Sequence, residues 1–217
     1  MPGQDPTGDS LIKANDDFQE LLLKYTSKNK ETLIYPFKNL NDSGLSIHTS
    51  KDKKFRIYSW DTWTGGTMHF YRNVFQFQGA KSIHSKTIQS YRENDDDPDC
   101  IYRSLSDLRV GPNTYYVTLS VAVGSSAIYY HTAKVFSLNG DKLNDTVKLI
   151  KTRSGLQNEV GYEIDLHNAD ISEDWDKMYP AYDKDKQEII LPLVDGNGRV
   201  TGKKIIYKFR GSYFQKI

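Results

Sequence analysis

Apolar residues near the N-terminus recur every three or four positions, which is the spacing of a helix with one apolar face. Asp9 or Ser10 can cap the first turn, and the polar stretch SKNK at 27–30 ends the pattern with cations near the negative end of the helix dipole. The pattern predicts an amphipathic helix over about residues 10–28 that packs against the rest of the domain. Its apolar face comprises Leu11, Ala14, Phe18, Leu21, Leu22 and Tyr25.

Beyond residue 44 the chain has the pattern of short strands separated by turn residues such as GPN, GSS, NGD and DGNG. Polar turns that contain Asp and Lys recur before apolar strands, without a strict period. This repetition is typical of antiparallel hairpins or a meander in a propeller-like or sandwich-like body. We therefore expect an all-β fold with one N-terminal helix. The expected strands are 45–50, 55–62, 67–77, 81–88, 100–105, 115–123, 127–138, 160–166, 188–194 and 203–209.

Two aromatic-rich stretches, FRIYSWDTWTGGTMHFY at 55–71 and IIYKFRGSYF at 205–214, resemble stretches of uncharacterised exported bacterial proteins with all-β bodies. The resemblance covers a small part of the chain and contains no catalytic motif. It implies a fold class and nothing about activity.

The first nine residues, MPGQDPTGD, are rich in Pro, Gly and Asp and too polar to pack. We expect a disordered leader at 1–9 and a single domain at 10–217. Such a leader favours a secreted or periplasmic protein that has lost a signal segment. The alternative is a cytoplasmic protein with a frayed start.

Charge, hydrophobicity and cysteine content exclude several classes of partner and of covalent cross-link. The chain has 29 Lys and Arg against 28 Asp and Glu and contains no basic block, so neither nucleic acid nor an anionic membrane surface is expected as partner. No apolar run approaches the roughly 20 residues that span a bilayer, so no integral membrane segment is expected. The single cysteine, Cys100, excludes an intrachain disulfide.

The stretch SWDTWTGG at 59–66 predicts a hairpin, because Gly65 and Gly66 suit a two-residue turn with positive φ. This turn sets a register in which both faces are aromatic or apolar and Asp61 lies diagonal to Arg72, within reach for a charge pair. The register pairs Trp63 with Met68, Asp61 with Phe70, Ser59 with Arg72, Trp60 with Tyr71 and Tyr58 with Asn73.

Two interpretations of this hairpin stay open. Its aromatic rings can be core, which is the common fate of such residues. Alternatively, Trp60, Trp63 and Tyr71 can stack on a sugar or peptide while Asp61 and His69 make polar contacts. The second interpretation predicts a non-enzymatic binding or interaction module outside the cytoplasm. The alternative function is a glycan-directed hydrolase with paired carboxylates drawn from Asp61, Glu163, Asp165 and Asp183.

No cofactor or metal is expected. The five histidines, at 48, 69, 84, 131 and 167, show no metal-binding spacing, so a zinc site would need distant strands. The acidic stretch ENDDDPDC at 93–100 and DGNG at 195–198 lack the ligand pattern of a calcium loop and are expected to be solvated loops. Glycine-rich phosphate loops and the GxSxG motif are absent. The acidic neighbours of Cys100 are expected to raise the pKa of its thiol, which argues against a catalytic cysteine.

Overall fold

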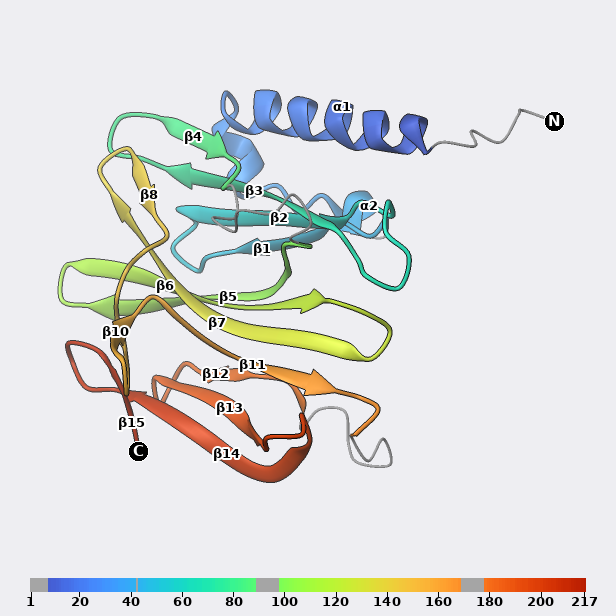
Figure 1. Ribbon diagram of the computed structural model, residues 1–217. Helices are drawn as coiled ribbons and strands as arrows, with labels where there is room; N and C mark the ends of the chain where they lie inside the picture. The colour runs from blue at the N-terminus through green and yellow to red at the C-terminus, as the bar shows by residue number, and fades with distance from the viewer. Residues whose placement is uncertain (1–7, 42, 89–97, 169–177) are drawn as a thin grey trace.

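The computed structural model describes residues 8–41, 43–88, 98–168 and 178–217, and it shows three β-sheets stacked beneath an N-terminal helix (Figure 1). Helix α1 (Asp9–Thr26) is followed by a 3-10 turn, η1 (Lys30–Leu33), and by the short helix α2 (Lys38–Asn41). The expected all-β class with one N-terminal helix is confirmed. The described strands form open sheets and no closed barrel. The expected leader lies almost wholly outside the described residues.

The first sheet is an antiparallel meander with the strand order β1-β2-β3-β4. The middle sheet has the order β11-β7-β6-β5, and the short strand β8 pairs with the far end of β7. The strands of the first sheet are β1 (Ser46–Thr49), β2 (Phe55–Asp61), β3 (Tyr71–Gln78) and β4 (Ile83–Lys86). Those of the middle sheet are β5 (Ile101–Val110), β6 (Asn113–Val123), β7 (Ile128–Asn139), β8 (Lys142–Asn144) and β11 (Glu159–Asp165).

The third sheet has the order β10-β9-β15-β14-β13-β12. Strand β15 pairs with β9 in parallel, whereas its pairing with β14 is antiparallel. The strands are β9 (Ile150–Thr152), β10 (Gly155–Gln157), β12 (Ala181–Asp183), β13 (Glu188–Val194), β14 (Val200–Phe209) and β15 (Phe214–Lys216).

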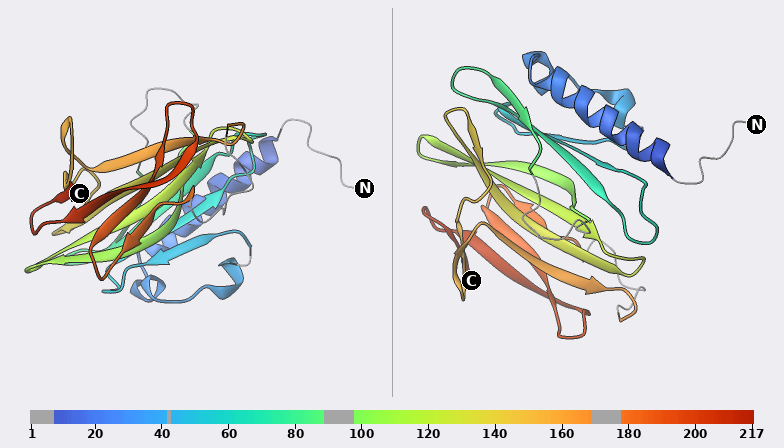
Figure 2. Two further views of the ribbon diagram at one scale, coloured as in Figure 1. Left: turned by 90° about the horizontal axis from the view of Figure 1, so that it is seen from below. Right: turned by 45° about the horizontal axis from the view of Figure 1, so that its top comes forward.

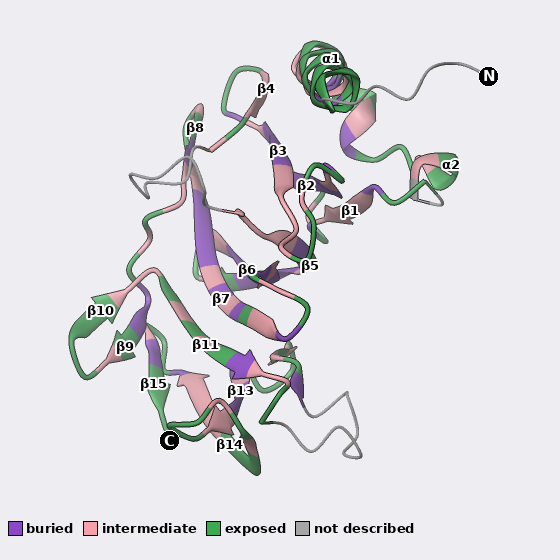
Figure 3. Cartoon of the chain, turned by 45° about the vertical axis from the view of Figure 1, so that its right-hand side comes forward, coloured by how far each residue is buried: buried purple, intermediate pink, exposed green. Residues whose placement is uncertain are grey.

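The sheets are stacked in layers, with the middle sheet between the other two (Figure 2). Two apolar cores hold them together and cover the middle sheet on both sides. The upper core joins the first and middle sheets through Phe55, Ile57, Phe75, Tyr116 and Phe136, among others. The lower core joins the middle and third sheets through Val117, Val135, Ile189, Leu191 and Phe214, among others. A strand buried on both faces gains from apolar side chains at consecutive positions. This explains the run YYVTLSVAV in β6, whose inner residues are nearly all buried (Figure 3).

Helix α1 packs on the outer face of the first sheet with only part of the face that the apolar spacing predicts, because Phe18 and Leu22 contact the sheet but other members of that face do not. Leu22 is buried, which stabilises the fold by about 1.5–3 kcal/mol. Leu11, Leu21 and Tyr25 are 38, 50 and 57% exposed, so this part of the prediction was wrong. The residues that lie beside Leu22 on the buried face are polar, Asn15 and Thr26. The predicted cap was also wrong, because Gly8 is the N-cap residue and Asp9 already lies in the helix.

Asn15 explains the rotation of α1. Its side-chain amide donates to the carbonyl of Thr62, and its oxygen accepts the indole N–H of Trp60, each at 2.9 Å. A buried amide without such partners would cost about 1–3 kcal/mol. The helix therefore turns Asn15 towards the sheet, and part of its apolar stripe is left outside.

The predicted hairpin register is wrong by one residue. Strands β2 and β3 pair Trp60 with Arg72 and Asp61 with Tyr71, and residues 62–70 form a loop between them. Neither glycine of the expected turn has positive φ, whereas Trp63 does, at 57°. Because a shift of one residue moves a side chain to the other face, the expected pair of Asp61 and Arg72 does not form.

Arg72 instead faces α1, where its guanidinium donates to Asp16 at 2.7 Å. Gly65 has a different role from the one expected. A Cβ at this position would lie 2.0 Å from the carbonyl oxygen of Met68, so the close approach of two backbone segments, rather than positive φ, requires glycine here.

Candidate functional site

Trp63 is the most exposed large apolar residue of the described chain, at 71%. It lies in the 62–70 loop with its backbone in the left-handed region, at φ 57°. For a residue with a bulky side chain this conformation costs roughly 1–2 kcal/mol and persists only when neighbouring groups impose it. The loop therefore holds an indole ring outward at the expense of backbone strain.

Asp61 imposes that conformation. One of its carboxylate oxygens accepts the backbone N–H of Trp63 at 2.8 Å, and the other accepts from Nδ1 of His69 at 2.5 Å. The His69 ring stacks on Tyr71, with ring centroids 6.2 Å apart, and lies 6.4 Å from the Trp63 ring. Burial, and then the nearby Asp61 charge, raise the pKa of Tyr71 to about 12, so its hydroxyl stays protonated. Together these four side chains form a cluster with one open aromatic face.

Trp60, the fifth expected site residue, lies on the opposite face of β2. It is 7% exposed and packs edge to face on Phe18 of α1, with ring centroids 5.0 Å apart. The structure therefore brings together Asp61, Trp63, His69 and Tyr71 and separates Trp60 from them.

The loop is anchored to the middle sheet, beside an open cleft. The backbone N–H of His69 donates to the carbonyl of Val123, and that of Tyr71 donates to the carbonyl of Pro98. Pro98 lines the cleft, which has a volume of about 590 Å³, within the range of small-molecule sites. The cleft separates the first sheet from one end of the middle sheet. Its described lining includes Phe75, Cys100, Tyr102, Ser120, Tyr130, Thr132, Lys134, Asp145, Glu159 and Glu163.

The cleft is acidic. Asp99, Asp145, Glu159 and Glu163 line it, and Lys134 is the one basic residue in its described lining. The Lys134 ammonium lies 3.6 Å from Glu159 and 4.0 Å from Asp145, so it is shared between these two carboxylates. Glu163 makes no hydrogen bond or ion pair with any described side chain and is exposed. The lining therefore carries an excess of negative charge.

Cys100 does not have the character of a nucleophile. Burial first, and then the neighbouring Asp99, raise the pKa of its thiol well above the ordinary value. The direction agrees with the expectation from sequence, although burial rather than the acidic neighbours is the larger cause.

The four carboxylates proposed for a hydrolase are not gathered at one place. Asp61 belongs to the first sheet, and Asp183, in the third sheet, accepts the backbone N–H groups of Asp185 and Lys186. Asp165 accepts from the backbone of His167 and from the side chain of Asn168. Of the four, Glu163 alone lines the cleft.

The histidines are also dispersed. Within the described ranges, no three side chains of His, Cys, Asp or Glu lie close enough to hold a metal ion. The stretch 93–100 lies mostly outside these ranges. In DGNG, the Asp195 carboxylate accepts hydrogen bonds from the backbone N–H groups of Asn197 and Arg199, which close the expected turn. These bonds, the one from Asn197 most strongly, lower the pKa of Asp195.

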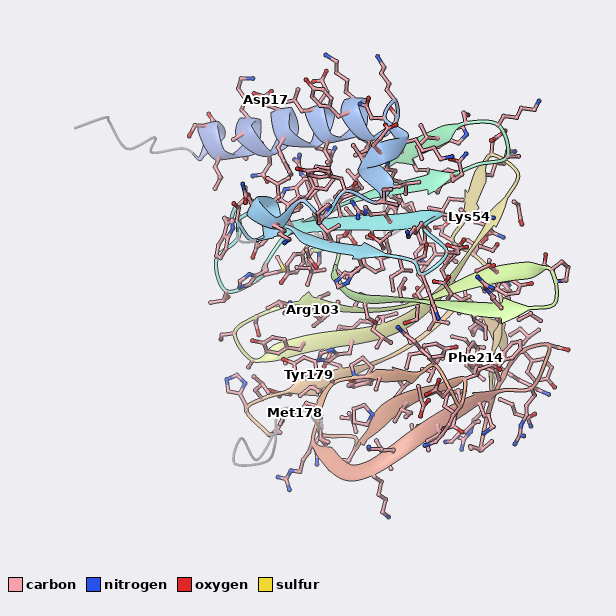
Figure 4. The ribbon with its side chains drawn as sticks, turned by 180° about the vertical axis from the view of Figure 1, so that it is seen from behind. Asp17, Lys54, Arg103, Met178, Tyr179 and Phe214 are labelled. Carbon is pink, nitrogen blue, oxygen red and sulfur yellow. The ribbon has the colours of Figure 1, made fainter. Side chains whose placement is uncertain are left out.

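A smaller cavity of about 340 Å³ lies on the other face of the middle sheet, where it is lined by Arg103, His131 and Tyr179, among others. Figure 4 shows Arg103 on the middle sheet and Tyr179 below it. His131 is 3% exposed and stacks on Tyr162, with ring centroids 5.2 Å apart. Burial, helped by the charge of Arg103, lowers its pKa to about 4. His131 is therefore a neutral core residue at neutral pH.

The cleft was not predicted from the sequence. Its residues come from the start of β5, from β6, β7 and β11 and from the first sheet. The one usable signal was in β7, where Tyr130, Thr132 and Lys134 alternate with the more buried His131, Ala133 and Val135. This alternation indicates a face that is not fully covered, but not what lies opposite it.

Helices in the described part of the chain are too short or too polar to cross a membrane. Comparison of the chain with protein-family models, curated proteins and solved structures gave no match.

Proposed function

We propose that this protein is a non-enzymatic binding module, and that the open face of Trp63 stacks on a sugar ring or an extended peptide. Asp61 and His69 lie at the edge of that face and offer polar contacts. Tyr71 supports the imidazole from the inner side. An apolar ring beside fixed polar groups is the usual composition of a small-ligand site.

The observation that carries the proposal is the combination of exposure and strain at Trp63. An indole that is 71% exposed gives up most of the free energy it would gain from burial. Its left-handed backbone adds a further cost. Packing alone accounts for neither feature, whereas a preorganised ring for a ligand accounts for both.

The test is a glycan array and a peptide array probed with the wild-type protein and with Trp63→Ala. We expect binding to a subset of ligands, and we expect Trp63→Ala to weaken it at least tenfold. The matched control is Tyr35→Ala, which removes another exposed ring, 59% exposed, from a different segment. Equal binding by wild type and Trp63→Ala would contradict the proposal.

Ligands found on the arrays are also incubated with the protein and analysed for cleavage. Hydrolysis that Glu163→Gln abolishes would favour the alternative of a carboxylate-dependent hydrolase over a binding module. Binding without turnover supports the proposed function.

A further inference from the structure

Strand β11 is an outer strand of the middle sheet, and its outward backbone groups can be identified. The backbone N–H of Val135 donates to Asn158, and that of Leu166 donates to Ala127. Both bonds belong to one antiparallel register with β7, in which hydrogen-bonded pairs alternate with non-bonded pairs. The even-numbered residues of β11 therefore bond to β7, and the odd-numbered residues point their N–H and C=O groups outward.

Three consecutive outward positions have no backbone partner among the described residues, namely Glu159, Gly161 and Glu163. All three are exposed, and Figure 3 shows an exposed, green stretch on β11. The next one, Asp165, donates its N–H to the carbonyl of Gly198, so the edge is covered only from that point on. A row of unpaired outward groups on a regular strand is a template for an added strand.

The side chains of Glu159 and Glu163 face the acidic cleft. Between them Gly161 leaves room for the ring of Tyr130, since a Cβ there would lie 2.9 Å from the Tyr130 hydroxyl. Tyr130 also lines the cleft and is 39% exposed. An added strand would thus place alternate side chains next to carboxylates and an aromatic ring.

We propose that the free edge of β11 binds an extended basic peptide segment of another protein, which adds a strand to the middle sheet. Main-chain hydrogen bonds to Glu159, Gly161 and Glu163 provide affinity, and the cleft provides selectivity. Two Lys or Arg side chains four residues apart in the peptide lie opposite Glu159 and Glu163. The residue midway between them lies over Gly161 beside the Tyr130 ring. This site shares no residue with the proposed Trp63 site.

A second copy of this chain is a poor occupant of the edge. Two β11 strands paired antiparallel about Gly161 would place Glu159 of each opposite Glu163 of the other. Like charges directly opposite in a ladder destabilise the pair. The shared Lys134 is already engaged by Glu159 and Asp145. A basic strand satisfies the same backbone groups and compensates the excess of negative charge.

The test uses a synthetic seven-residue peptide with the sequence Thr-Lys-Thr-Val-Thr-Lys-Thr and blocked ends. Calorimetry at low salt measures binding, and hydrogen exchange measures protection of individual amides. We expect binding that slows exchange at Gly161 and Glu163. A peptide with Glu in place of both Lys residues, and one methylated on the backbone nitrogens that face β11, should each bind at least tenfold more weakly.

Glu163→Gln is the variant of choice, because this side chain is exposed and makes no ion pair. It should weaken binding about 3- to 10-fold and leave the melting temperature unchanged. Glu31→Gln, an exposed carboxylate in η1, is the matched control and should bind as wild type does.

Three outcomes would overturn the proposal: no binding, binding without protection of the β11 amides, or equal weakening by Glu163→Gln and Glu31→Gln. Because Trp63→Ala leaves the β11 edge intact, it should bind this peptide normally. The outcome of the Trp63 experiment is therefore independent of this one.

Discussion

The interface beneath α1 and the loop at 62–70 each hold one tryptophan, and the two rings have opposite surroundings. Trp60 is 7% exposed, has Phe18 against its ring and donates its indole N–H to Asn15. Trp63, three positions further on, is 71% exposed and rests on a strained backbone. Two tryptophans in the same short stretch of sequence therefore have opposite environments, one in the core and one exposed on the surface. The difference comes from what covers each residue, because α1 packs over Trp60 on β2, whereas Trp63 lies in the loop beyond the end of that strand.

Polar groups have different roles in the two regions. Beneath α1 and the segment that follows it, they satisfy one another in a covered layer. The buried Arg56 donates to the carbonyls of Thr32 and Tyr35, and Gln76 donates to that of Thr26. In the loop, Asp61 fixes the orientation of an exposed ring. The first arrangement prevents the cost of unpaired buried groups, and the second preorganises a surface.

The largest expected effect separates the two tryptophans directly. Trp60→Ala should lower the free energy of unfolding by about 3–5 kcal/mol, because it leaves a cavity and an unpaired Asn15. Trp63→Ala should change it by less than about 0.5 kcal/mol. Urea denaturation followed by circular dichroism measures both values. Similar losses in the two variants would remove the distinction between core and presented ring.

A second test compares buried with exposed histidines. The pKa of His131 is about 4 in the folded protein, below the ordinary value of 6.5, so the unfolded chain binds the extra proton between these values. Stability is therefore full above about pH 6.5 and falls as the pH falls towards 4, by roughly 2 kcal/mol between pH 7 and pH 5. Urea denaturation at pH 7 and pH 5 should show that the free energy of unfolding falls less in His131→Phe than in the wild type. His167→Phe, in which an exposed ring changes, should keep the full loss.

The two loop glycines provide a matched pair. Gly65→Ala should destabilise the protein by about 1 kcal/mol, because its Cβ would clash with the Met68 carbonyl and the loop must shift. Gly66→Ala should be nearly neutral, since nothing lies within 4 Å of the added atom. Thermal denaturation of both variants tests whether the loop conformation requires glycine only where two backbone segments approach closely, at Gly65, and not at Gly66.

A modest loss of stability is expected from Asp61→Ala, at about 0.5–1 kcal/mol for the lost hydrogen bonds. Its effect on the loop should be clearer, because Trp63 loses the group that holds its backbone. Hydrogen exchange at the Trp63 amide should accelerate markedly, while the amides of β2 keep their protection. An unchanged rate at Trp63 would show that Asp61 does not impose the conformation.

Local pattern was sufficient for the long strands. The expected segment 115–123 lies within β6, and the expected segment 188–194 coincides with β13. Both are apolar runs bounded by turn residues. The short strands β8, β9, β10, β12 and β15 were not expected, since three residues carry no measurable period. Their pairing depends on neighbours that are distant in the sequence.

The candidate site was only partly predictable. Asp61, Trp63, His69 and Tyr71 could be selected because they are close in sequence and chemically suited to a ligand. Trp60 could not be separated from them, because the register of β2 and β3 depends on the length and conformation of the 62–70 loop. Two glycines suggested a tight turn, whereas the Asp61 to Trp63 hydrogen bond ends the strand earlier.

The sequence by itself determined the all-β class, the presence and extent of α1, and the absence of an intrachain disulfide, because these follow from periodicity, turn residues and composition. Only the tertiary structure decided which face of α1 is buried, which tryptophan is exposed and where the acidic cleft and the free edge of β11 lie. These features depend on pairings between residues as far apart as Asn15 and Trp60, or Lys134 and Glu159. Local pattern contains no information about such contacts, since burial and hydrogen bonding there are set by the partner segment rather than by the residue itself.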